Sequence, residues 1–444
     1  MYQNFLRDTL DIRSFCLALL YSKVVKRSLL FVKSNAMFLS FVFFCLVELF
    51  IIRSLVDLPV GLWNFLPKAQ ELANWQIPSS NYYGPGSALM LLPFLWNGPS
   101  YFFAVVFYFT IGVICYWKIC AYIPNSKFRI FALLALPLNV YLFSLSITGN
   151  DTVYEFFLLQ LIVLGFIKNI FWLQLSAGVL LAASRSQYWA LILLTAIVGF
   201  VYSWVKSKKL QKKYLAPLLI YISLSIFNFS QYGSPSPALE GGITAYDAYS
   251  KYYYLSHPKY DMDAFLAQTE HPLPEIVQRK LDNNPMSEVE MDRAYYSAAI
   301  SSALTNPKET ILGLFQKIDS YFFAVQKIPN LPGEYVLNAE KKQIDILNER
   351  KSWPLIVGHI VYQVYRSLWL ILGIMALGFL FLRRKKYEID SRLYYLVAPW
   401  LCGAIAGLLY YTETRYKIVP EMILVPLIAI IWSEEKRISH TTSV

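Results

Sequence analysis

Long apolar segments alternate with short polar segments along almost the whole chain. An apolar run of about 20 residues is enough to cross the hydrocarbon core of a bilayer as a helix. The pattern therefore predicts an all-α polytopic membrane protein with about ten transmembrane helices. The predicted spans are residues 35–54, 99–119, 130–147, 152–167, 170–184, 188–205, 214–230, 354–382, 392–411 and 416–433.

The spans group into modules around one long polar region. The predicted modules are a cytoplasmic interfacial lead-in (1–34), an N-terminal transmembrane module (35–230) with its first external loop at 55–98, a mainly helical external region (231–353), C-terminal transmembrane helices (354–433) and a cytoplasmic tail (434–444). In the external region, a helical pattern from Asp292 to about Phe323 is interrupted at Asn306-Pro307, where Pro307 suits the first turn of a new helix. The segment Ile311–Phe323 is apolar on one face, so we expect it on the outer membrane surface.

Charge supports the membrane assignment and orients the spans. Charged residues make up 16% of the 444 residues, below the roughly 25% that is usual in soluble proteins. The net charge of +11 comes largely from short Lys/Arg clusters beside apolar runs, which is typical of cytoplasmic loops. No basic region is long enough for a folded nucleic-acid-binding surface, so a nucleic-acid partner is excluded.

The segment Gly86–Trp96 is apolar but covers only about half a bilayer crossing. If it stays outside, the cluster of Lys118, Lys127 and Arg129 becomes cytoplasmic, as the positive-inside rule requires. If it crossed, every later basic cluster would lie on the wrong side. We therefore predict a juxtamembrane helix here.

This topology brings acids and arginines to the non-cytoplasmic face. Asp151 and Glu155 are one helical turn apart at the start of the predicted span 152–167, so both can point into one cavity. A carboxylate can deprotonate an attacking hydroxyl, and an arginine fork binds phosphate oxygens. The polar residues predicted on this face are Asp57, Glu71, Asp151, Glu155, Arg185, Glu413 and Arg415.

Each of these residues also has a simpler interpretation. Asp151 could only cap its helix, and Arg185 and Arg415 could extend towards a membrane interface. Asp57 could be solvated in its loop. Glu48, inside the first span, is either functional or paired locally, for example with Arg53.

Several short motifs, taken in order, resemble the GT-C superfamily of membrane glycosyltransferases, which includes the protein O-mannosyltransferases and aminoarabinose transferase. The resemblance covers nearly the whole chain, and the order of the elements is more specific than any one motif. The motifs are Asp57 in the first external loop, Tyr83-Gly84-Pro85-Gly86 before the juxtamembrane helix, Asp151 before the fourth span, Ala182-Ala183-Ser184-Arg185, the segment Ala299–Lys317, and Glu413-Thr414-Arg415-Tyr416 followed by Pro420.

The resemblance implies a reaction outside the cytoplasm with a sugar carried on a polyprenyl phosphate or pyrophosphate. The family's acid in the first loop, a catalytic base or a metal-binding residue, corresponds to Asp57, and the acid lining the same cavity corresponds to Asp151. A divalent metal cofactor is therefore allowed, although no other cofactor is expected. The family's phosphate-binding arginine corresponds to Arg415. The residues expected to bind substrate are Glu71, Tyr83, Glu155, Arg185, Glu413, Arg415 and Tyr416.

The leading hypothesis is an inverting glycosyltransferase with a polyprenyl-linked sugar donor and a glycan, lipid or protein acceptor, surrounded by membrane lipid. We expect a multi-pass protein of a bacterial inner membrane with its active site on the periplasmic or extracellular face. The alternatives are a glycan polymerase or ligase acting on lipid-linked chains, and a transporter of lipid-linked oligosaccharide. A non-catalytic assembly subunit is a further alternative, since a fold resemblance alone does not establish activity.

Overall fold

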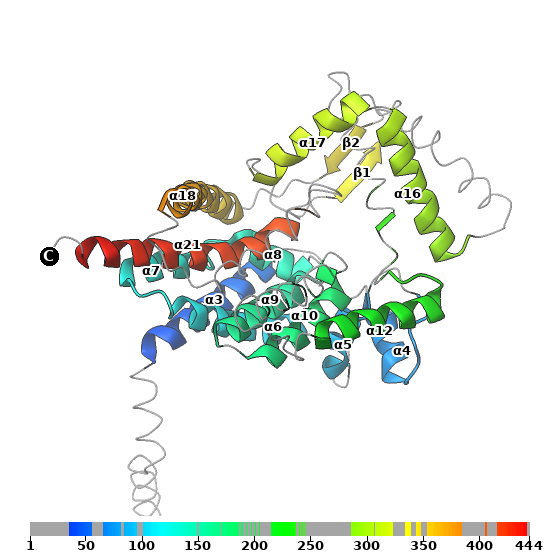
Figure 1. Ribbon diagram of the computed structural model, residues 1–444, viewed down its shortest axis with the longest axis horizontal. Helices are drawn as coiled ribbons and strands as arrows, with labels where there is room; N and C mark the ends of the chain where they lie inside the picture. Colours follow the sequence, from blue (N-terminus) through cyan, green and yellow to red (C-terminus); the bar gives the residue numbers. More distant parts are fainter. Residues whose placement is uncertain are drawn as a thin grey trace, which may run out of the picture.

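The structure is a computed structural model that is mostly helical (Figure 1). It describes residues 35–55, 65–80, 84–95, 101–148, 151–168, 170–185, 215–236, 286–305, 307–322, 334–338, 343–347, 353–383 and 415–441, with single residues between 188 and 245 and at 405. The helices are α3 (Ala36–Leu55), α4 (Leu66–Ala73), α5 (Gly86–Leu91), the 3-10 helix η2 (Leu92–Phe94), α6 (Tyr101–Cys120), α7 (Ser126–Leu134), α8 (Val140–Thr148), α9 (Thr152–Ile167), α10 (Phe171–Ser184), α12 (Leu215–Tyr232), α16 (Glu288–Thr305), α17 (Pro307–Phe322), α18 (Trp353–Arg383) and α21 (Arg415–Thr441).

Three of these helices are long and apolar enough to cross a membrane: α3, α6 and α12. Shorter apolar stretches lie in α9, α10, α18 and α21. The membrane character predicted from the sequence is therefore supported by helix length and composition. The number of ten spans stays a prediction, because the predicted spans at 188–205 and 392–411 lie almost wholly outside the described residues.

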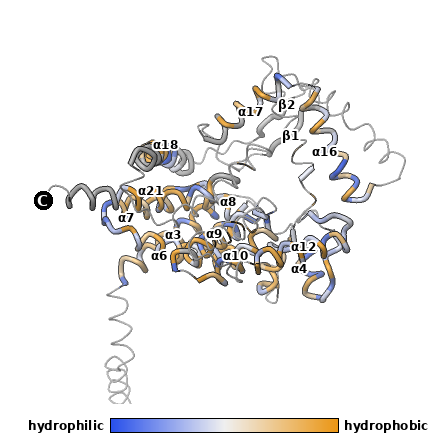
Figure 2. The backbone as a smooth tube through the Cα atoms, in the orientation of Figure 1, coloured by the Kyte–Doolittle hydropathy of each residue, from blue (hydrophilic) through white to orange (hydrophobic). Residues whose placement is uncertain are grey.

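The helix bundle is built around aromatic contacts between α6, α8 and α9. The ring of Phe109 lies 4.9 Å from that of Phe143 and 5.6 Å from that of Phe156, and all three side chains are buried. Gly112 lets the ring of Phe156 approach α6, because an added Cβ would lie 2.6 Å from that ring. Figure 2 shows hydrophobic residues concentrated in this bundle, whereas the first part of α16 is hydrophilic.

The predicted span 130–147 is wrong as a single helix, because α7 ends at Leu134 and α8 begins at Val140. Pro137 lies in the interruption, and proline has no N–H for a helical hydrogen bond. Asn139 then starts the second helix, because its Oδ1 accepts a hydrogen bond from the backbone N–H of Leu142 (3.0 Å). Asn139 is fully buried, so the break lies inside the protein.

The helix predicted after Gly86 is present as a short element, and its juxtamembrane position stays a prediction. Helix α5 has 6 residues and is followed directly by η2. At 1.5 Å per residue, α5 extends only about 9 Å, far less than the roughly 30 Å of a bilayer core. It packs against α4 and against the end of α10.

The predicted boundary at Asn306-Pro307 is confirmed, since α16 ends at Thr305 and α17 begins at Pro307. The N-terminus of α16 carries a reciprocal cap: the Oγ of Ser287 accepts from the N–H of Glu290 (3.3 Å), and the carboxylate of Glu290 accepts from the N–H of Ser287 (2.9 Å). The all-α prediction is wrong in one place: β1 (Glu334–Asn338) and β2 (Gln343–Leu347) form an antiparallel ribbon, in which Glu334 pairs with Leu347.

Helix α18 lies over α21 and α8 (Figure 1). It is seen end-on in this view, whereas α21 runs across the view, so the two helices cross. Glycines allow the close contacts: an added Cβ at Gly358 would lie 2.7 Å from Val140, and one at Gly373 would lie 2.9 Å from Ile428.

Candidate functional site

The candidate site is centred on the first turn of α9, where Asp151 and Glu155 lie one turn apart. The backbone N–H of Glu155 donates to the carbonyl of Asp151 (3.0 Å), so the two residues belong to the same helical turn. The helix N-terminus carries a partial positive charge, which favours carboxylates in this position. The sequence spacing alone predicted that both acids would share a helix face.

Arg185, which follows the last residue of α10, forms ion pairs with both acids. Its Nη2 lies 2.6 Å from Oδ1 of Asp151, and its Nη1 lies 3.0 Å from Oε2 of Glu155. The Nη2 also donates to the hydroxyl of Thr152 (3.5 Å). The side chain of Arg185 is only 5% exposed, so it points into the protein and not towards a membrane interface.

Tyr188 completes this cluster, which we call the Arg185 cluster (Asp151, Glu155, Arg185 and Tyr188). Its hydroxyl donates a hydrogen bond to Oε1 of Glu155, and its side chain is fully buried. The cluster holds one arginine and two carboxylates, so its formal charge is negative. Sequence reasoning missed Tyr188, although it lies only three residues after Arg185.

The Tyr-Gly-Pro-Gly element lies directly against the end of α10. An added Cβ on Gly84 would lie 1.9 Å from the carbonyl oxygen of Ala183, and one on Gly86 would lie 2.5 Å from the N of Ser184. Only glycine fits such close backbone contacts. Two predicted motifs that are about 100 residues apart in sequence therefore meet beside the Arg185 cluster.

Replacing Gly86 with alanine is expected to destabilise the protein by about 1–3 kcal/mol, because α5 must move away from the backbone of α10. Thermal unfolding in detergent micelles measures the change. Gly178→Ala is the matched control, because Gly178 also lies at α10 but an added Cβ there has no atom within 4 Å. An equal loss of stability in both variants would contradict the steric argument.

The other predicted site residues are not all part of this cluster. Glu71 lies on α4, where its carboxylate accepts hydrogen bonds from the N–H (3.1 Å) and the hydroxyl (2.8 Å) of Ser79 and so closes its own loop. Arg415 and Tyr416 are the first two residues of α21, and nothing is described of their side chains. The remaining candidates, Asp57, Tyr83 and Glu413, lie outside the described residues.

A second buried charge pair joins α18 and α21. The Nε of Arg366 donates to Oε2 of Glu421 (3.0 Å), and its Nη2 donates to Oε1, so the contact is bidentate. Only 4% of Arg366 and 2% of Glu421 is exposed. Sequence reasoning missed this pair, although the rule that drew attention to Glu48 applies equally to an ionisable residue in the middle of α18.

Glu48 lies on α3, and its Oε2 is buried without a hydrogen-bond partner. Nearby on the same helix, Cys45 is fully buried.

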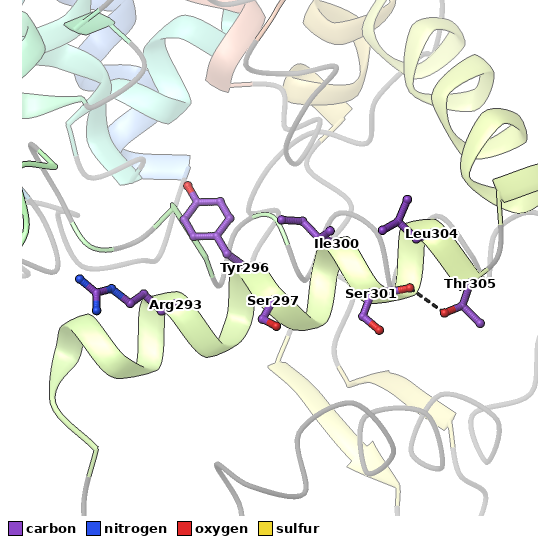
Figure 3. A pocket seen from close by; sticks show the side chains of 7 residues that line it. All are labelled: Arg293, Tyr296, Ser297, Ile300, Ser301, Leu304 and Thr305. Atoms are coloured by element: carbon purple, nitrogen blue, oxygen red, sulfur yellow. Dashed lines mark hydrogen bonds between the residues drawn. The ribbon is translucent and has the colours of Figure 1, made fainter.

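An open hollow of about 670 Å³ lies along α16 (Figure 3). Tyr296, Ile300 and Leu304 project on one side of the helix, and Ser297 and Ser301 project on the other. The segment after α12 is held near this helix, because the N–H of Gly242 donates to Oδ1 of Asp292 (2.6 Å). Burial raises the pKa of the Asp292 carboxyl above its ordinary value, and the hydrogen bond from Gly242 opposes this shift. The residues that line the hollow are Arg293, Tyr296, Ser297, Ile300, Ser301, Leu304 and Thr305.

Among the residues that the structure describes, no group of three or more His, Cys, Asp or Glu side chains is placed to hold a metal ion. The chain matches no protein-family model, no curated protein and no solved structure.

Proposed function

We propose that the protein is an integral-membrane glycosyltransferase that moves a sugar from a polyprenyl phosphate or pyrophosphate to an acceptor hydroxyl on the non-cytoplasmic face. The observation that carries the proposal is the meeting of three predicted site motifs. These motifs come from separate parts of the sequence and lie together at the start of α9 and the end of α10. They are the Asp151/Glu155 pair, Arg185 and the Gly84–Gly86 element.

In the proposed reaction, Asp57 takes the proton from the acceptor hydroxyl, and the oxygen attacks the anomeric carbon of the donor sugar. A new C–O bond forms, the bond between the anomeric carbon and the phosphate oxygen breaks, and the electron pair leaves with the phosphate. Attack from the opposite side inverts the anomeric carbon. Arg415 stabilises the negative charge that develops on the leaving phosphate.

Arg185 has a positioning role in this proposal. Because it is ion-paired with Asp151 and Glu155, its charge is already balanced by protein groups. It therefore fixes the orientation of the two acids, and Asp151 is the member nearer to solvent, with 12% of its side chain exposed. We assign Asp151 to the wall of the donor cavity, where its carboxylate accepts hydrogen bonds from sugar hydroxyls.

The hollow along α16 supports an acceptor site in the external region. Serine, threonine and tyrosine hydroxyls alternate there with the apolar side chains of Ile300 and Leu304. Sugars present hydroxyl edges and apolar C–H faces, so a lining of this kind suits a glycan acceptor.

The proposal is tested by transfer from a defined polyprenyl-linked sugar in detergent, with the wild type and Asp57→Asn. The variant is expected to lose about 10²- to 10⁴-fold in kcat, because asparagine cannot accept the proton. Asp390→Asn is the matched control, since Asp390 lies in a predicted cytoplasmic loop. Full activity of Asp57→Asn removes Asp57 as the base, and absence of transfer by the wild type with any polyprenyl-linked sugar counts against the whole proposal.

A transporter of lipid-linked oligosaccharide is the second candidate. It is favoured by the buried Arg366–Glu421 pair and by the break between α7 and α8, because interior charges and interrupted helices are common where transporters bind their substrates. Reconstitution in vesicles separates the two functions. A transporter moves the lipid-linked sugar between leaflets without releasing the lipid phosphate, whereas a transferase releases it.

A further inference from the structure

Helices α16 and α17 present large apolar side chains to the outside of the protein. Leu304 is 76% exposed and Phe315 is 65% exposed. Ile300 and Ile311 are also more than half exposed. An exposed apolar face of this kind is unusual in a soluble domain and marks a surface that contacts a membrane or a partner.

The apolar side chains of α17 are exposed because the opposite side of the helix packs against α16. Gly313 is buried, and the hydroxyl of Thr310 donates to the carbonyl of Ala303 (3.1 Å), so this side of α17 faces α16. Ile311, Phe315 and Ile318 follow one another at intervals of four and three residues and share the exposed side. The more apolar face of the helix therefore points away from the protein.

A basic residue accompanies the apolar face of α17. Lys308 is exposed in the first turn of α17, one turn before Ile311. Positive side chains beside an apolar helix face are typical of helices that lie on anionic lipid.

Apolar helices flank α16 and α17 in the sequence. Helix α12, a candidate span, precedes α16, and the apolar helix α18 begins at Trp353 after the β ribbon. If both helices are in the membrane, the region between them is attached to the bilayer at both ends.

We infer that the face of α17 formed by Lys308, Ile311, Phe315 and Ile318 docks on the outer leaflet and prefers anionic phospholipid. The apolar side chains enter the boundary between headgroups and acyl chains, and the ammonium of Lys308 contacts lipid phosphates. This docking does not depend on the proposed glycosyl transfer, and it would hold the α16 hollow at the membrane surface.

The test uses the full chain in nanodiscs with a photoreactive benzoylphenylalanine in place of Phe315, and the same probe in place of Ser301 as the matched control. Ser301 is also exposed, but it lines the hollow of α16 and does not belong to the apolar face of α17. Illumination followed by mass spectrometry is expected to show phospholipid crosslinked at position 315 and little at position 301. In nanodiscs with anionic lipid, adding Lys308→Gln lowers the crosslink yield by up to roughly fivefold, whereas in purely zwitterionic nanodiscs it has no effect.

Two results would overturn the inference. Equal lipid crosslinking at positions 315 and 301 means that the apolar face is not specifically docked. Crosslinking of position 315 to a second copy of the chain, or to another part of the same chain, means that protein covers this face. If Lys308→Gln does not lower the crosslink yield in nanodiscs with anionic lipid, the docking stands but the preference for anionic lipid is overturned.

Discussion

Replacing Glu421 with leucine is expected to lower the free energy of unfolding by about 3–5 kcal/mol, one of the largest effects of any single change in this protein. Glu421 is the bidentate partner of Arg366, and both side chains are buried. The variant leaves the guanidinium in an apolar environment without a carboxylate, and the desolvation of a lone charge is costly. Arg366→Leu is expected to have an effect of similar size. Unfolding in mixed micelles by titration with a denaturing detergent measures both.

The double variant Arg366→Leu/Glu421→Leu is expected to recover most of the lost stability, because it removes both charges together. Lys127→Gln, which removes an exposed charge at the start of α7, is the control and should change stability by no more than about 0.5 kcal/mol. If each single variant and the double variant behave alike, Arg366 and Glu421 do not form an energetically coupled pair. If the double variant is stable but transports or transfers nothing, the pair serves function and not stability.

Local features of the fold could be predicted because they depend on neighbouring residues. The 3.6-residue period and Pro307 were enough to locate the boundary between α16 and α17. The short apolar length after Gly86 predicted an element that does not cross the membrane, and α5 has only 6 residues. The shared face of Asp151 and Glu155 followed from their spacing of four.

The break between α7 and α8 and the strand β2 each have a pattern in the sequence, but a competing pattern outweighs it. Pro137 and Asn139 together predict a helix end and a helix start, yet the apolar character of residues 130–147 favoured one continuous span. The residues Gln343–Ile346 alternate polar and apolar side chains, as a half-buried strand does, but four residues are a weak pattern in a helical region.

Contacts between distant elements could not be predicted, because the sequence does not determine how each helix is rotated about its axis. The predicted topology placed Arg185 and Asp151 on the same face of the membrane. Their direct ion pair, however, depends on the packing of α9 against α10. The same limit applies to Arg366 and Glu421, which are 55 residues apart and meet only because α18 crosses α21.

Replacing Arg185 with methionine is expected to have an effect on both stability and activity. Two buried carboxylates lose their ion pairs with Arg185, so the free energy of unfolding should fall by about 3–5 kcal/mol. Under the proposed function, transfer should fall further than the folded fraction does, because Asp151 and Glu155 are no longer held in one orientation. Detergent unfolding and the kcat of the folded fraction measure the two effects separately.

Arg185→Lys separates charge from geometry. Lysine keeps the positive charge, but its single ammonium cannot reproduce the two-pronged contact that one guanidinium makes with Asp151 and Glu155. We therefore expect Arg185→Lys to have a free energy of unfolding between the values of the wild type and Arg185→Met. Its kcat should be close to that of Arg185→Met. Tyr188→Phe is the matched control, since it removes one hydrogen bond to Glu155 and leaves both ion pairs intact. A kcat of Arg185→Lys equal to that of the wild type would show that balancing the charge of the two acids is sufficient, and that the arginine does not act by orienting them.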